Sequence, residues 1–175
     1  MKKIKTLLVG MLFIALSGCD INDTPIKLTA SNSITKDIDL SVAQTSGTPF
    51  SLDIRETINI ADVASNVADV TDVKINSISY KYKDFTGNEA GRIQSVLLKI
   101  DNVVLVQEAN VDVFSETDNA VIHQVTDTAK LTKLEQVLLS DKETQLAVIG
   151  SILSDAGAMN FKMEVSISLT VTLKS

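Results

Sequence analysis

The chain has 175 residues, of which 45% are hydrophobic and 4% aromatic, and its formal net charge is −6. This length and composition suffice for one domain with a sizeable hydrophobic core, whereas two domains would be cramped. Because phosphate binding requires a concentrated basic patch, we expect no nucleic-acid partner for this acidic chain.

The chain begins with a short leader of charged and apolar residues. Three lysines lie within the first five residues, and the apolar run Leu7–Leu16 and the small residues Ser17 and Gly18 follow them. A helix that crosses a bilayer needs about twenty apolar residues, and this run has about half that length. The leader is therefore predicted to be an export signal that is removed, not a permanent membrane span.

The end of the leader, Leu16-Ser17-Gly18-Cys19, resembles the lipobox of bacterial lipoproteins. In that family the cysteine sulfur is diacylated and the leader is cut immediately before it, here between Gly18 and Cys19. Cys19 is the only cysteine, so it has no partner for an intramolecular disulfide. Two or more acyl chains anchor a protein firmly, and the resemblance implies a mature protein that stays on a membrane. The alternatives are an ordinary signal peptide with an incidental cysteine, and an uncleaved anchor.

The residues after Cys19 bear on location and organisation. Asp20 resembles an inner-membrane retention signal of some bacteria, whereas in others acidic residues near this position accompany export to the cell surface. We expect a location in the bacterial cell envelope, with the outer membrane or cell surface favoured and the inner membrane left open. Residues Asp20–Thr24 are polar and end before Pro25, which is typical of a tether. The expected parts are a signal peptide (1–18), the lipidated cysteine with its tether (19–25) and one domain (26–175).

The first part of the domain alternates between apolar and polar residues. This alternation is typical of strands, because successive side chains of a strand point to opposite faces. Three strands are predicted, over 26–30, 38–42 and 50–58. From Asn59 the apolar spacing changes to i, i+3, i+4 and i+7, which predicts one short helix over 60–67.

Residues 73–82 are apolar at alternate positions, but in two phases. Val73 and Ile75 lie in one phase, whereas Ile78 and the two tyrosines after it lie in the other. Because a β-bulge inserts one extra residue, a bulge near Asn76-Ser77 explains the change. The segment is therefore predicted to be one bulged strand.

Residues 92–106 form a long β-rich run that Asp101-Asn102 interrupts. The run is either one bent strand or two. Short strands are also predicted at 111–113 and 120–125.

A second helix is predicted over 131–139, where four apolar residues have helical spacing and Thr132 with Glu135 matches a capping box. The strand predicted over 145–153 is apolar on both faces, which favours a central position in a sheet.

The last strand, Phe161–Leu173, has the clearest pattern, because apolar and polar residues alternate without a break. It is predicted to bury its odd-numbered side and expose the other. The short loop 155–158 precedes it, so this strand and the strand over 145–153 are expected to be antiparallel neighbours.

About eight or nine strands with one or two short helices predict a mainly β fold, an antiparallel two-sheet β-sandwich. An α/β layer design would require a helix after nearly every strand. The order of long amphipathic strands with small crossover helices resembles the immunoglobulin-like or related β-sandwich domains of bacterial surface and periplasmic lipoproteins. This resemblance is architectural and implies no catalytic motif.

Candidate catalytic and metal-binding residues are few. His123 is the only histidine, and no G-x-S-x-G signature accompanies it, so a packed or half-exposed strand histidine is the simpler interpretation. Acidic residues could bind calcium, but none has EF-hand spacing, and Asp and Asn are also preferred in turns. These acids are Asp69, Asp72, Asp84, Asp101, Glu116 and Asp118. We predict no metal, no cofactor and no catalytic residue.

Tyr80 and Tyr82 are the only tyrosines and share one face of their predicted strand. An aromatic pair can stack on a sugar or anchor a partner protein, so these residues are the candidate partner surface. The simpler interpretation is that they fill the core or cover an open end of the sandwich.

Three hypotheses of function follow. The first is a lipid-anchored envelope lipoprotein that acts as a non-catalytic structural or binding module through loops or a sheet edge, with an envelope protein as partner. The second is a carrier or envelope-assembly accessory that holds a small apolar ligand between the sheets. The third, an enzyme, requires titratable groups that converge on His123, and we expect no enzymatic activity.

Overall fold

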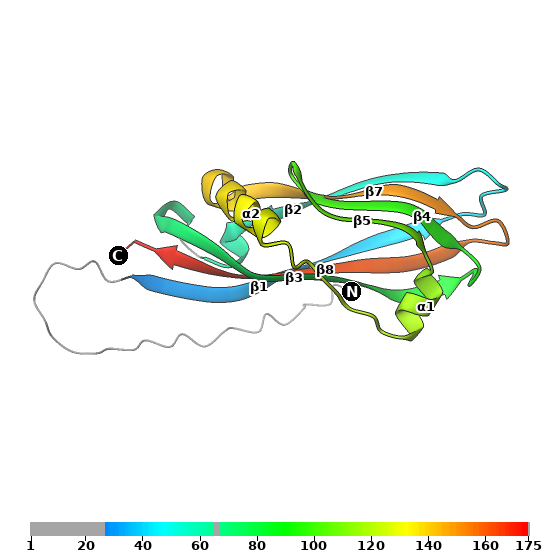
Figure 1. Ribbon diagram of the computed structural model, residues 1–175, viewed down its shortest axis with the longest axis horizontal. Helices are drawn as coiled ribbons and strands as arrows, with labels where there is room; N and C mark the ends of the chain where they lie inside the picture. The colour runs from blue at the N-terminus through cyan, green and yellow to red at the C-terminus, as the bar shows by residue number, and fades with distance from the viewer. Residues whose placement is uncertain (1–26, 65–66, 175) are drawn as a thin grey trace, which may run out of the picture.

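The computed structural model describes residues 27–64 and 67–174, so the leader, Cys19 and the tether lie outside the described residues. Two antiparallel four-stranded sheets pack face to face (Figure 1), which confirms the predicted β-sandwich. The first sheet contains, in spatial order, β1 (Leu28–Val42), β8 (Met159–Leu173), β3 (Val70–Gly87) and β6 (His123–Gln124). The second contains β2 (Phe50–Asn59), β7 (Glu143–Leu153), β4 (Arg92–Ile100) and β5 (Val103–Val111). The short elements are η1 (Ile60–Asp62), η2 (Val67–Asp69), α1 (Val113–Asp118) and α2 (Thr128–Asp141).

β8 is the centre of the first sheet and confirms the face assignment made from its sequence. Every odd-numbered residue from Met159 to Val171 is buried, whereas the even-numbered residues between them point to the outer face. β8 pairs with β1 on one side and with β3 on the other, so all three strands contribute to the same buried layer.

β3 has the predicted bulge. Its pairing with β8 shifts register between Ile75 and Ser77, and both Ile75 and Ile78 are buried although their parity differs. The backbone N–H of Ile75 donates a hydrogen bond of 2.8 Å to the side chain of Glu135 on α2. β6 pairs with β3 only at Ser79 and Tyr80, so at Ile75 a side chain of α2 satisfies a backbone donor of β3.

The prediction that the last two strands are antiparallel neighbours is wrong. β7 pairs with β2 and β4 in the second sheet, whereas β8 belongs to the first. The loop 154–158 therefore crosses from one sheet to the other instead of closing a hairpin. A loop of this length serves either connection, and its sequence does not distinguish them. β7 is nonetheless an inner strand, as its two-sided apolar pattern predicted.

Residues 26–30 and 38–42 were predicted as two strands, but Leu28–Val42 is one strand. The stretch between the predicted strands is polar because the second sheet does not cover this end of β1 (Figure 1). Asn32 is therefore exposed, although Ala30 and Ile34 on the same face of the strand point inward. The break in the apolar pattern reflects missing cover, not a missing strand.

The predicted helix over 60–67 is also wrong. Two short 3-10 turns, η1 and η2, take its place, and Ile60 and Ala64 are buried there. Asn59 caps η1, because its side chain accepts a hydrogen bond of 2.8 Å from the N–H of Ala61.

The segment between β5 and β7 differs from prediction in three ways. Residues 111–113, expected to form a short strand, instead contain the last residue of β5 and the first residue of α1, a helix that was not predicted. Of the strand expected at 120–125, only the two residues of β6 pair in a sheet. α2 begins at Thr128 with Asp127 as its cap, so the Thr132–Glu135 capping box is not used. The run 92–106 contains β4 and the first part of β5, separated by a turn at Asp101-Asn102.

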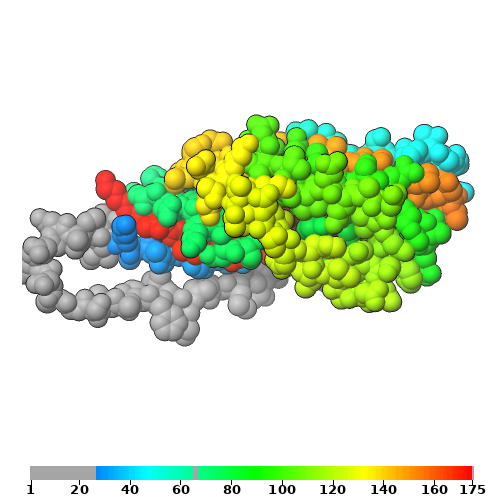
Figure 2. All heavy atoms as spheres, in the orientation of Figure 1, coloured from blue at the N-terminus to red at the C-terminus, as the bar shows by residue number. Residues whose placement is uncertain are grey.

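The molecule is elongated, and its two ends differ (Figures 1 and 2). At the end that we call proximal, β1 begins opposite the last residue of β8, and Leu28 pairs with Leu173. At the distal end lie the loops 43–49, 88–91 and 154–158.

The distal loops brace one another. The carboxylate of Asp155 accepts hydrogen bonds from the hydroxyl of Thr45 (2.8 Å) and from the N–H of Gly47 (2.5 Å). The side-chain amide of Asn88 donates to the hydroxyl of the buried Ser154 over 2.9 Å. Three loops that are distant in sequence therefore form one cross-linked tip.

Candidate functional site

The strongest grouping of titratable side chains lies along one open side of the sandwich, between β5 and β6. These are the last strands of their sheets, so the two sheets leave a seam here. Tyr80 and Tyr82 reach the seam from β3, Glu108 from β5, Glu116 from α1 and His123 from β6. We call these five side chains the seam cluster.

His123 lies at the middle of the seam cluster. Its Nε2 is 2.8 Å from Oε2 of Glu116, and its Nδ1 is 3.7 Å from Oε1 of Glu108. The imidazole ring stacks on Tyr80 with ring centres 4.7 Å apart and planes 9° from parallel. Both ring nitrogens therefore face carboxylates, and one ring face is covered.

Both tyrosine hydroxyls donate to Glu108. Tyr80 donates to Oε1, and Tyr82 donates to Oε2 over 3.5 Å. Burial raises the pKa of both phenols, and the charge of Glu108 raises each pKa further, so the hydroxyls stay protonated and act as donors. Phenol donors of this kind stabilise a carboxylate that lies on the inner side of the sheet.

Tyr80 and Tyr82 do not form the possible partner surface considered for them. Their side chains are only 3% and 1% exposed, because the strand face that they share is the inner one. Tyr82 also packs edge-to-face against Phe161, with ring centres 6.0 Å apart. The simpler interpretation, in which the tyrosines fill the core, is the one that the structure shows.

The polypeptide that closes the seam is held by several independent contacts. β6 pairs His123 with Tyr80, and the N–H of Val125 donates to the carbonyl of Ile78 over 2.9 Å. Farther along the seam, the ammonium of Lys130 donates to the carbonyl of Leu105 on β5 over 3.1 Å.

A groove of about 410 Å³ remains beside these contacts. Its lining includes Glu108, His123, Asp127 and Lys130.

The chemical capacity of the seam cluster is limited by its internal bonding. The enzyme hypothesis required titratable groups that converge on His123, and such groups do converge. However, both nitrogens of His123 already face glutamates, and the two neutral phenols already donate to Glu108. The geometry is that of a polar clamp that joins the two sheets and α1.

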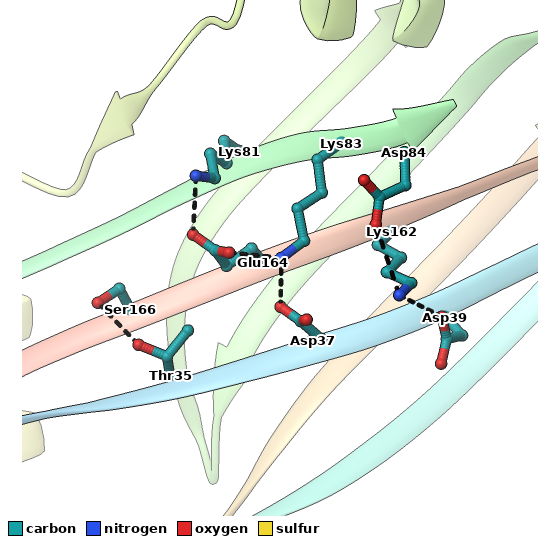
Figure 3. Close-up of polar contacts among 9 residues, drawn as sticks. All are labelled: Thr35, Asp37, Asp39, Lys81, Lys83, Asp84, Lys162, Glu164 and Ser166. Carbon is teal, nitrogen blue, oxygen red and sulfur yellow. Dashed lines mark hydrogen bonds and ion pairs between the residues drawn. The ribbon is translucent and has the colours of Figure 1, made fainter. Parts of the chain in front are cut away.

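A second polar group covers the outer face of the first sheet (Figure 3). The ammonium of Lys83 lies 2.8 Å from Asp37 and 2.5 Å from Glu164, and that of Lys81 lies 3.0 Å from Glu164. The two hydrogen-bonded carboxylates raise the pKa of Lys83, and the bond from Lys83 is the main cause that lowers the pKa of Glu164. Opposite charges on neighbouring strands thus neutralise one another across the sheet.

The acids considered for calcium do not form one site. Asp84 pairs with Lys162 over 3.5 Å, Glu116 contacts His123, and Asp101 lies in the turn between β4 and β5. Within residues 27–64 and 67–174, no three His, Cys, Asp or Glu side chains gather in a way that would hold a metal ion. In the same part of the chain, no helix is long and apolar enough to cross a membrane.

Glu108 is the member of the seam cluster that the sequence did not identify. The pairing of β5 with β4 shifts register between two neighbouring pairs: Leu98 pairs with Val106, whereas Lys99 pairs with Val104. This shift lies between Val103 and Glu108, so alternation alone does not give the face of Glu108. The only signal is its pairing with Val96, a buried residue, and that pairing requires the structure.

Comparisons with known proteins give little further information. No family model matches the chain, and no curated protein matches it. Among solved structures, the chain is similar to the VP2 subviral particle of infectious bursal disease virus, with a TM-score of 0.33 and 10% sequence identity. That similarity covers 89% of this chain and 39% of the viral chain.

Proposed function

We propose that this protein is a lipid-anchored lipoprotein of the bacterial cell envelope that acts as a non-catalytic structural or binding module. The observation that carries the proposal is the sequence Leu16-Ser17-Gly18-Cys19, placed after a charged and apolar leader and containing the only cysteine of the chain. Cleavage after Gly18 and acylation of Cys19 place the anchor a short polar tether before β1, which begins at Leu28.

The sandwich separates the point of attachment from the braced loops. β1 begins at the proximal end, so a tether that ends there attaches the domain to the membrane by its proximal end. The braced loops lie at the distal end, far from the point of attachment (Figure 1). A tip whose loops are already ordered pays less conformational entropy on binding than mobile loops would. Binding of an envelope protein through this tip is the function that we propose for the distal loops.

The internal bonding of the seam cluster supports a non-catalytic role. A general base needs a nitrogen or oxygen that is within reach of a substrate proton. The nitrogens of His123 face Glu108 and Glu116 instead. The cluster is better suited to holding two sheets together than to proton transfer.

The anchor is tested by Cys19→Ser in the full chain. The variant is expected to remain unprocessed and to lose lipid attachment, because serine has no thiol to acylate. Membranes are washed at alkaline pH and partitioned in a phase-separating detergent, and processing is followed by mass. Asn22→Ser, a change in the tether that leaves Cys19 intact, is expected to partition as the parent does. If Cys19→Ser partitions as tightly as the parent and carries the same added mass, the lipoprotein proposal fails.

Binding through the tip is tested with a photo-crosslinking residue introduced in intact cells. One variant carries it at Thr48 in a distal loop and a matched variant carries it at Thr71, which is exposed near the proximal end. We expect the same discrete protein adduct from position 48 in repeated experiments and none from position 71. Equal adducts from both positions would contradict a binding site at the tip.

A further inference from the structure

Among the strands that the structure describes, the sandwich has four edges, and three of them are guarded against pairing with another strand. β2 has Asp53, Arg55 and Glu56 within its ten residues. On β5, Lys130 binds an edge carbonyl and the pairing register is interrupted. β6 is two residues long, and α1 and α2 both contact β3 beside it. Charges, bulges, short strands and covering helices are the usual protections of sheet edges.

The fourth edge, β1, lacks these protections over its first half. Residues 28–35 contain no charged residue, proline or glycine. β1 pairs with β8 through fifteen consecutive residues without a register shift, so the strand is regular to its end. Leu28 is 50% exposed there, which is unusual for a large apolar side chain in this protein. A long, regular and uncharged edge presents unpaired backbone groups that another strand can bind.

We propose that the β1 edges of two copies of this chain pair antiparallel around Asn32 and join their first sheets into one continuous sheet. For the inner faces of both sheets to lie on the same side, paired residues must have equal parity along β1. A two-fold axis perpendicular to the sheet must therefore pass through a residue and not between two residues.

The sequence of β1 is self-complementary when Asn32 is the central residue. On the outer face, Ser31 then lies opposite Ser33 of the second copy, and Thr29 lies opposite its Thr35. On the inner face, Ala30 lies opposite Ile34, Leu28 lies opposite Lys36, and the two Asn32 side chains meet. Cross-strand pairs of hydroxyl residues and of apolar residues are favourable.

Charge and side-chain pairing together favour this register over its two neighbours. With Asn32 at the centre, Lys27 lies opposite Asp37 of the second copy, so two opposite-charge pairs form at the ends of the interface. In its own chain Asp37 lies 2.8 Å from the ammonium of Lys83. With Ser31 at the centre, Lys27 would face Thr35 and these pairs would be lost. With Ser33 at the centre, Lys27 would face Asp39, but each Asn32 would face Ile34 instead of the other Asn32. The partner that fits this edge is thus a second copy, not an unrelated segment.

The pairing is tested by cysteine crosslinking of the full chain in intact cells. In the proposed register the two residues at position 32 lie directly opposite, at a Cα separation of about 4.5–5.5 Å, which a disulfide can bridge. Asn32→Cys is expected to give a disulfide-linked homodimer on mild oxidation. Thr57→Cys on β2 is the control at a guarded edge. The parent, whose only cysteine is Cys19, controls for that thiol. No homodimer from Asn32→Cys, or linkage to a different protein instead, would overturn the proposal.

A charge exchange tests the register independently. S31K/S33K places lysines opposite each other twice across the interface, whereas S31K/S33E places each lysine opposite a glutamate. In detergent-purified full chain we expect dimer dissociation to be about tenfold easier in S31K/S33K than in S31K/S33E. Melting temperatures at concentrations where both are monomeric show whether either variant is misfolded. Equal self-association of two folded variants would refute pairing through these residues.

Discussion

The two edge strands of the first sheet, β6 and β1, have opposite surroundings. On the β6 side, the seam cluster brings together residues from β3, β5, β6 and α1, and its polar groups bond to one another. On the β1 side, residues 28–35 carry no charge, and no other strand of the described residues pairs with their outer edge. The first arrangement stabilises the fold, because each buried polar group depends on its partners. The second contributes little to stability and leaves backbone groups available for another strand.

The largest expected effect concerns the strand that both sides share, β8. Ile167→Asp removes about 1.5–3 kcal/mol of apolar burial and places a carboxylate in the core. Because typical stabilities are about 5–15 kcal/mol, we expect the variant to be largely unfolded. Ser168→Asp, on the outer face of the same strand, is expected to change stability by about 0.5 kcal/mol or less. Thermal unfolding measures both variants, and equal melting temperatures would show that β8 is not one-sided.

The second expected effect separates the two sides. Glu108→Ala leaves the hydroxyls of Tyr80 and Tyr82 without their acceptor in a buried site. An unsatisfied buried donor costs about 1–3 kcal/mol, and we expect a loss of that order in urea denaturation. Glu56→Ala on β2 removes an exposed glutamate and is the matched control, expected to stay within about 0.5 kcal/mol. A loss no larger than that of the control would mean that the seam cluster does not hold the sheets together.

These two positions also show what the sequence reveals about the fold. The face of Ile167 follows from alternation, since β8 pairs with β1 without a bulge and every odd-numbered residue from Met159 to Val171 is buried. The bulge in β3 was visible because apolar residues on both sides changed phase together. The inward position of Glu108 could not be predicted, because the register shift in β5 interrupts the alternation and a single polar residue does not show which face it occupies. Pairing partners were hidden too, since a short loop joins strands in one sheet or in two.

The third expected effect is pH dependence on the closed side. The pKa of Tyr82 is raised by burial, whereas in the unfolded chain it is about 10. The unfolded state therefore loses this proton first as the pH rises, and stability present below pH 10 is lost above it. The slope for one such group is at most about 1.4 kcal/mol per pH unit. Urea midpoints between pH 9.5 and 11 are expected to fall less steeply for Tyr82→Phe than for the parent. Lys83, whose pKa is also raised, contributes equally to both proteins, so identical slopes would exclude this role for Tyr82.

The smallest expected effect is on the open side. Ser33 is exposed on β1, and Ser33→Ala removes a hydroxyl without creating a cavity or an unpaired buried group. We expect the free energy of unfolding of the monomer to change by about 0.5 kcal/mol or less, measured by urea denaturation at low protein concentration. Ser31→Ala extends the comparison, because the Ser31 hydroxyl shares a hydrogen bond of 2.7 Å with Thr170 on the exposed outer face. If either change destabilised the monomer as much as Glu108→Ala, both edges would hold the fold together. A small effect instead means that folding does not constrain these residues, so their lack of charge is free to serve strand pairing.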